Sequence, residues 1–171
     1  MYRVIGALLI VVCTAVLGFG GVLRLGRRVR NLTGLVSALE IMKGEICERL
    51  TPMPELFELL AGTMEGPVAG LFQACGEQMT TLGESSMYLI WKSAVRSAEE
   101  LELSEQEART LTEVGHVLGR YDAEEQRTAI SFAIRRMEGC LHRAEEEKRA
   151  QTKVRAALGV TAGLFVVIIL L

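Results

Sequence analysis

The sequence has few of the residues on which enzyme and metal sites depend. Only two of its 171 residues are histidine, and its four cysteines stand far apart, without a Cys-x-x-Cys pair. A glycine-rich phosphate loop with its lysine is absent, and so is a Gly-x-Ser-x-Gly motif; these patterns typify nucleotide-binding sites and serine hydrolases. We therefore predict no catalytic residue, cofactor or metal site, and we expect the cysteines to be reduced thiols.

Signals for β-structure are also missing. No segment of useful length alternates apolar and polar residues, and no Asn-Gly or Asp-Gly pair marks a hairpin. Apolar residues recur instead at helical spacing, for example Ile130, Ala133, Ile134 and Met137. The pattern predicts an all-α chain, a helical bundle of about six helices with N- and C-terminal transmembrane helices.

Prolines, glycines and capping residues mark where the helices of the bundle should begin and end. The first should run out of the membrane to Leu50, and Thr51-Pro52 should stop it because the residue before proline disfavours the α region. Ser104 and Glu107 have the spacing of a capping box, and Asp122 marks the start of another helix in a similar way. The expected helices are residues 25–50, Pro54–Ala61, Gly66–Leu82, Met87–Leu101 with Leu89 facing inward, 105–118, and one from Asp122 toward the membrane.

Both ends of the chain lack charge. Val4–Leu23 is a run of twenty uncharged residues, and Ala156–Leu171 is a run of sixteen. A bilayer core of about 30 Å needs roughly 20 helical residues, so the first run fits and the second is short. We predict an uncleaved anchor over residues 1–24, a cytoplasmic helical bundle over 25–153, and a second anchor over 154–171.

Acidic residues are absent outside residues 40–147. That window holds all 21 acids but only ten of the 19 bases, whereas eight bases flank the two apolar runs on the inner side. Lys and Arg near membrane segments stay in the cytoplasm, which predicts a two-pass protein with a cytoplasmic domain. A domain this acidic argues against nucleic-acid binding. Its surface is either a docking face for a basic partner or simply a solvated face.

Glu113 and His116 form a Glu-x-x-His pair on a predicted helix, as in di-iron bundles. A di-iron site needs two such pairs and two further glutamates, and the chain has only one other histidine, His142. The metal set is therefore incomplete. A small membrane-tethered helical sensor, or a metal- or ligand-binding domain, is the alternative function.

Three local patterns resemble those of a known family. They close the first long helix, link the last two helices, and open the C-terminal anchor: Glu45-Ile46-x-x-x-x-Thr51-Pro52, Leu118-Gly119-x-x-Asp122-x-x-x-Gln126, and Leu158-Gly159-Val160. Together with the length and the anchor–domain–anchor layout, they make the chain similar to the stage III sporulation protein AB family over essentially its whole length.

The resemblance carries several expectations. It implies a platform or assembly subunit of a sporulation-specific, secretion-like transenvelope complex, with a domain similar to the cytoplasmic domains of type II secretion and type IV pilus platform proteins. It implies a location at the membrane around the forespore, with the domain on the mother-cell side. The implied partners are an ATPase like stage III sporulation protein AA and other subunits of the channel complex. Glu45, Gly119, Asp122 and Gln126 carry over as candidate partner-binding residues.

Overall fold

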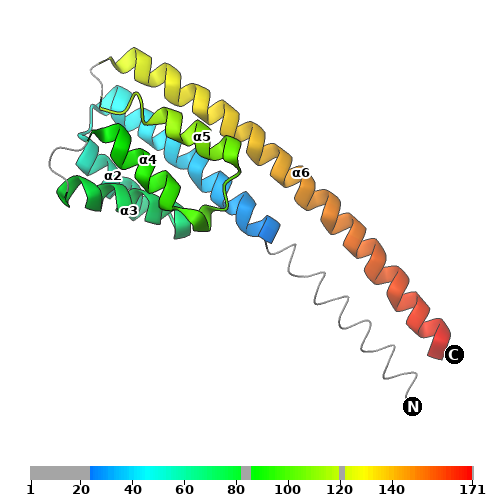
Figure 1. The fold of residues 1–171 in the computed structure, drawn as a ribbon. Coiled ribbons are helices and arrows are strands. Elements are labelled where there is room, and N and C mark those ends of the chain that lie inside the picture. Colours follow the sequence, from blue (N-terminus) through cyan, green and yellow to red (C-terminus); the bar gives the residue numbers. More distant parts are fainter. Residues whose placement is uncertain (1–23, 82–85, 120–121, 171) are drawn as a thin grey trace. The chain divides into compact units, whose positions relative to one another are not determined.

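The computed structural model describes residues 24–81, 86–119 and 122–170 (Figure 1). Within these ranges the chain forms six α-helices and two short helical turns, and no strand. The prediction of an all-helical chain with about six helices is confirmed for this part of the protein. The N-terminal anchor expected over residues 1–24 lies, but for its last residue, outside the described ranges.

The first described helix covers residues 24–44, and its helical course continues to the predicted end before Thr51-Pro52. It widens into a π-helical turn, η1 (Glu45–Arg49), and stops at Leu50, whose φ of 56° is left-handed. The side chain of Leu50, the last residue of the predicted first helix, is 73% exposed. The wider turn and the left-handed residue both change the helical spacing, which turns Leu50 away from the buried side of the helix.

Three helices follow, and the last is shorter than predicted. They are α2 (Met53–Thr63), α3 (Gly66–Thr81) and α4 (Met87–Ser97). The expected helix to Leu101 breaks at Ala98, and a 3₁₀ turn, η2 (Glu99–Leu101), takes its place. Leu89 was predicted to face inward and is 56% exposed, whereas Trp91 is fully buried.

The last two helices begin at the predicted caps. In α5 (Glu105–Val114) the Ser104 side chain accepts from the Glu107 amide, and the Glu107 carboxylate accepts from the Ser104 amide, which confirms the capping box. This helix ends at Val114, not near Leu118, and turns follow it. The long helix α6 (Ala123–Leu170) then begins directly after Asp122.

An aromatic cluster occupies the centre of the bundle. The rings of Phe57, Phe72 and Trp91 come from α2, α3 and α4, with centroids 6.0–6.4 Å apart. All three side chains are at most 1% exposed, and Trp91 Nε1 donates to the Leu111 carbonyl at 2.5 Å. Three of the few aromatic residues therefore join four helices at one point.

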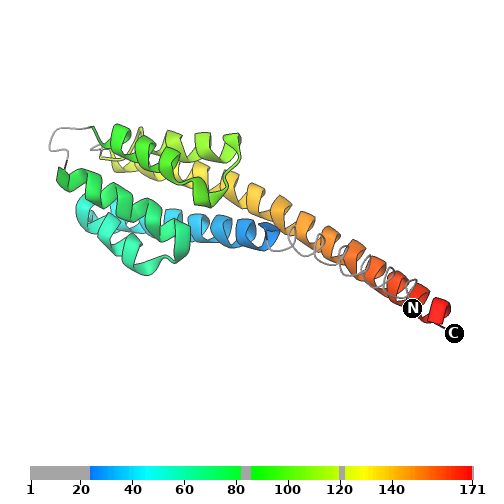
Figure 2. The ribbon, with the colours of Figure 1, turned by 60° about the horizontal axis from the view of Figure 1, so that its bottom comes forward.

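The chain divides into two compact units. Residues 30–141 form one and hold most of the bundle; of the described residues, 24–29 and 142–170 belong to the other. In the first unit, residues 30–44 run beside α6 in the opposite direction (Figures 1 and 2). Among the described residues, no helix has the length and apolar character needed to cross a membrane.

Candidate functional site

Glu45 is used to close the first helix. Its side chain is 10% exposed; Oε1 accepts from Arg49 Nη1 at 2.7 Å, and Oε2 accepts from Thr51 Oγ1 at 2.6 Å. Its backbone carbonyl also accepts from the Thr51 amide at 3.0 Å. Both carboxylate oxygens therefore hold the turn before Pro52, which gives Glu45 a structural role; its predicted partner-binding role stays a prediction.

Asp122 and Gly119 shape the connection between α5 and α6. Asp122 Oδ1 accepts from the amides of Glu124 and Glu125, both at 3.0 Å, as an N-cap does. Gly119 has a φ of +79°, a left-handed conformation that side chains disfavour. Asp122 is exposed at the surface, so its carboxylate remains accessible from solvent while it caps the helix.

Gln126 lies inside the bundle rather than on its surface. It is 3% exposed, and its Nε2 donates to the Val117 carbonyl at 2.9 Å. This bond ties the first turn of α6 to the turns that follow α5. A buried side chain with this contact is a poor first point of contact for another protein, and its predicted partner-binding role also stays untested.

A cysteine brings the Glu45 turn next to the start of α6. The Cys47 thiol donates to the Ala123 carbonyl with a sulfur–oxygen distance of 3.7 Å. Burial raises the pKa of this thiol, while the nearby Arg127 acts in the opposite direction. The four predicted site residues thus belong to segments that meet at one end of the bundle, although only Asp122 and Gly119 are exposed.

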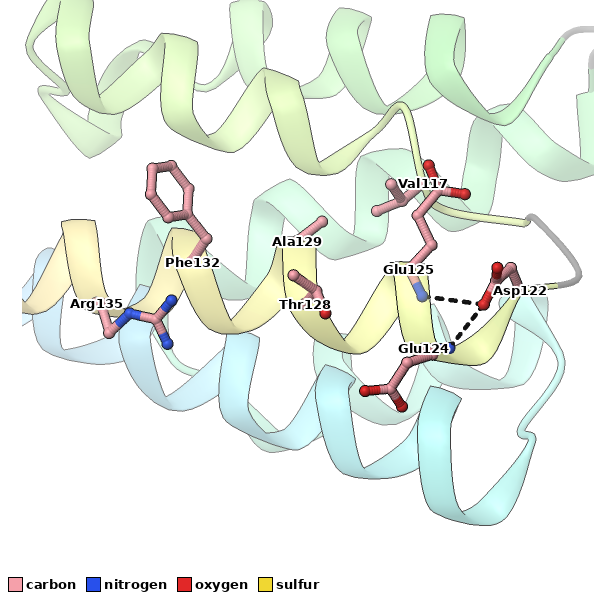
Figure 3. A pocket seen from close by; sticks show the side chains of 8 residues that line it. All are labelled: Val117, Asp122, Glu124, Glu125, Thr128, Ala129, Phe132 and Arg135. Atoms are coloured by element: carbon pink, nitrogen blue, oxygen red, sulfur yellow. Dashed lines mark hydrogen bonds between the residues drawn. The ribbon is translucent and has the colours of Figure 1, made fainter.

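A shallow groove begins at Asp122 and follows the exposed side of α6 (Figure 3). We call it the α6 groove. It is lined by Val117, Asp122, Glu124, Glu125, Thr128, Ala129, Phe132 and Arg135. Three carboxylates stand at its beginning, where the positive end of the helix dipole stabilises them.

Phe132 is the large apolar side chain of the α6 groove. It is 49% exposed, and the Arg136 guanidinium carbon lies 5.4 Å from the centre of its ring. Arg136 Nη1 also lies 3.8 Å from Glu113 Oε2 on α5. The ring is therefore held on the surface by a cation–π contact whose cation is paired with a neighbouring helix.

Sequence reasoning did not single out Phe132, Arg136 or the two glutamates beside Asp122. A usable signal was present. The buried side of α6 carries Ile130, Ala133, Ile134 and Met137, and Phe132 falls outside that stripe. A large aromatic residue on the polar side of an amphipathic helix has no core to fill, so it indicates a contact surface.

The Glu-x-x-His pair does not form part of a metal site in the described residues. Glu113 faces Arg136, and the His116 ring stacks on Tyr88 with a centroid distance of 4.1 Å. In the described part of the chain, no three His, Cys, Asp or Glu side chains are grouped so that they can hold a metal ion. Neither residue therefore points to the alternative function.

Comparison with known proteins gives consistent results. The family model described as stage III sporulation protein AB matches residues 3–171. The chain is 28% identical to stage III sporulation protein AB of Bacillus subtilis (strain 168) over 172 residues, which covers 100% of both chains. A solved structure of stage III sporulation protein AB superposes with a TM-score of 0.67 at 26% identity, covering 72% of this chain and 98% of that one.

Two of the three local patterns on which the resemblance depended have clear places in this structure: the Glu45–Thr51 turn closes the first helix, and Gly119, Asp122 and Gln126 form the joint between α5 and α6. The family model extends over nearly the whole sequence. The chain belongs to the stage III sporulation protein AB family and has a role in sporulation.

Proposed function

We propose that the protein is a non-enzymatic platform subunit of a sporulation-specific, secretion-like transenvelope complex. It docks a cytoplasmic ATPase like stage III sporulation protein AA and holds it at the membrane beside the other subunits. The observation that carries this proposal is the α6 groove, which is lined by the exposed ring of Phe132 and, nearer the start of the helix, by the carboxylates of Asp122, Glu124 and Glu125.

The α6 groove has the composition of a protein-binding surface. Aromatic side chains held rigidly at a surface make the largest contributions to many protein interfaces, and surrounding charges select and steer the partner. Here the Arg136 guanidinium already contacts the Phe132 ring without a partner present, and a side chain ordered before binding loses less entropy when it binds. The complementary surface of the ATPase would have basic residues around an apolar pocket.

The sequence supports the membrane location. The uncharged runs Val4–Leu23 and Ala156–Leu171 would supply the two proposed anchors, and the bases beside them favour a bundle on the cytoplasmic side. The family resemblance implies that this side is the mother cell. Such an anchor pair would keep a docked ATPase at the membrane around the forespore. The excess of acidic over basic residues within residues 40–147 would attract the basic surface of a partner over a long range.

A binding titration with surface variants tests the docking proposal. The full chain in mild detergent is immobilised, and the co-encoded ATPase is titrated at moderate salt. Phe132→Ala and the double variant Glu124→Lys with Glu125→Lys should each weaken binding by about 10-fold or more, since truncation of a central aromatic anchor or reversal of a facing charge costs over ~1.4 kcal/mol.

Matched controls use exposed residues outside the groove. Leu59→Ala removes a similarly exposed apolar side chain on α2, and Glu138→Lys reverses an exposed charge on α6. Both should leave the affinity within about twofold, because isolated surface positions contribute little. Equal binding by the parent, the Phe132→Ala variant and the charge-reversed variant would rule out this docking face.

A further inference from the structure

A second surface of the bundle complements the α6 groove in charge. It lies on α4 and is lined by Leu89, Lys92, Ser93, Arg96, Ser97 and Glu99; we call it the α4 patch. Two cations and one carboxylate surround it, whereas three carboxylates and one guanidinium line the α6 groove. The two surfaces therefore carry opposite charges within a bundle that is acidic elsewhere.

Each of these surfaces also carries an exposed apolar side chain. Among the described residues, five large apolar side chains are markedly exposed, and Leu89 at 56% and Phe132 at 49% are two of them. Leu89 belongs to the α4 patch and Phe132 to the α6 groove. Opposite charge around matching apolar centres is the arrangement found across specific protein interfaces.

In the described part of the chain, the charged side chains of the α4 patch form no ion pair with one another. Lys92 Nζ lies 5.4 Å from the centre of the Tyr88 ring on the same helix, a contact that leaves its ammonium at the surface. Arg96 stands one turn further along α4 and is exposed. Both cations can therefore reach carboxylates of another molecule.

We infer that the chain associates with itself by docking the α4 patch of one copy into the α6 groove of a second copy. Leu89 of the first copy packs against Phe132 of the second, and Lys92 and Arg96 face Glu124 and Glu125. Because the surfaces differ, such a contact is heterologous unless both form at once about a twofold axis. This association needs no ATPase, and because it uses the same α6 groove, one groove holds either a second copy or the ATPase at a time.

Charge reversal with complementation tests this inference. One full-length variant combines Lys92→Glu with Arg96→Glu, and a second combines Glu124→Lys with Glu125→Lys. In detergent and without ATPase, sedimentation velocity should show the parent self-associating and each variant alone associating at least about 10-fold more weakly, since facing like charges are strongly unfavourable.

The decisive sample is the equimolar mixture of the two variants. In the mixture, the acidic α4 patch of one variant faces the basic α6 groove of the other, and the remaining two surfaces match as well. Association should therefore return toward that of the parent, while a Glu58→Lys and Glu138→Lys control behaves like the parent. Circular dichroism and melting temperature establish that each variant is folded.

Two results would overturn the inference. A parent chain that stays monomeric over the whole concentration range excludes self-association by these surfaces. Variants that lose association without recovering it in the mixture show that the α4 patch and the α6 groove do not face each other. Because no ATPase is present, neither result bears on the proposed docking of the ATPase.

Discussion

Gly115 controls how closely α4 and the end of α5 approach each other. A Cβ atom placed on Gly115 would lie 2.5 Å from Cδ1 of the buried Trp91 ring, well inside van der Waals contact. Trp91 cannot move aside easily, because its indole nitrogen is bonded to the Leu111 carbonyl and its ring packs against Phe57 and Phe72. The closeness of this contact explains why a glycine stands there.

The first prediction is that Gly115→Ala lowers the free energy of unfolding by about 1–3 kcal/mol, the usual cost of overpacking a core. Chemical denaturation of the parent and the variant measures this change. The control is Gly139→Ala in α6, where a Cβ meets nothing within 4 Å. Alanine there should be neutral or raise stability by up to about 1 kcal/mol. A Gly115→Ala variant as stable as the parent would contradict the packing described here.

Cys75 makes stability depend on pH in the alkaline range. Its side chain is fully buried in α3, and burial raises its pKa from 9.0 to about 12. The unfolded chain therefore loses this proton at lower pH than the folded chain does. The contribution of the neutral thiol to stability is complete below pH 9 and is lost as the pH rises toward 12.

The second prediction follows from this loss of stability with rising pH. Between about pH 9 and 12, this group should lower the free energy of unfolding by up to about 1.4 kcal/mol per pH unit. Denaturation at several pH values, compared with the Cys75→Ala variant, isolates the contribution, since alanine has no proton to lose. Parallel pH profiles for the two proteins would count against the burial of this thiol.

At the level of elements, the capping role of Asp122 depends on its side-chain oxygen and does not require its negative charge. Asp122 Oδ1 accepts from two amides at the start of α6, a task that asparagine performs equally well. The third prediction is that Asp122→Asn keeps the melting temperature, whereas Asp122→Ala lowers the free energy of unfolding by about 1 kcal/mol. If Asp122→Asn folds normally but binds the ATPase more weakly, its charge belongs to the docking surface. Equal destabilisation by both variants would show that the cap is not formed as described.

The end of the first helix depends on a short polar network. The Thr51 hydroxyl donates a hydrogen bond to the nearly buried carboxylate of Glu45. The fourth prediction is that Thr51→Val lowers the free energy of unfolding by about 1–3 kcal/mol, because it leaves a buried acceptor without this donor. Thr63→Val is the control, since Thr63 bonds a carbonyl at an exposed position of α2. Thermal melts that give equal losses for the two variants would argue against a special role for the Glu45 turn.

Local signals predicted helix starts better than helix faces. The Ser104 and Asp122 caps were visible in the sequence because a cap depends on residues within one turn. The break at Ala98 was missed, and Leu89 was assigned to the wrong side of α4. The orientation of α4 is fixed by the contact of Trp91 with Gly115, two residues 24 positions apart, and a single amphipathic pattern does not contain that information.

At the scale of the whole molecule, the family is confirmed, and the all-helical class is confirmed for the part of the chain that the structure describes. The partner-binding roles of the four candidate residues stay predictions. Glu45 and Gln126 were predicted as partner-binding residues and lie buried in polar contacts. Asp122 remains at the surface, where Phe132, Glu124 and Glu125 join it in the α6 groove. A motif identifies residues on which a family resemblance depends, but only packing shows which of them face solvent.

Photo-crosslinking tests the central claim, that the α6 groove docks the ATPase. A photoreactive phenylalanine analogue replaces Phe132 in the full chain, and a second preparation carries it at Leu59, which is 41% exposed on α2. After irradiation with the co-encoded ATPase, docking in the α6 groove should give a specific crosslink from position 132 and little from position 59. A crosslink from position 59 with none from position 132, in samples that bind the ATPase equally, would contradict it.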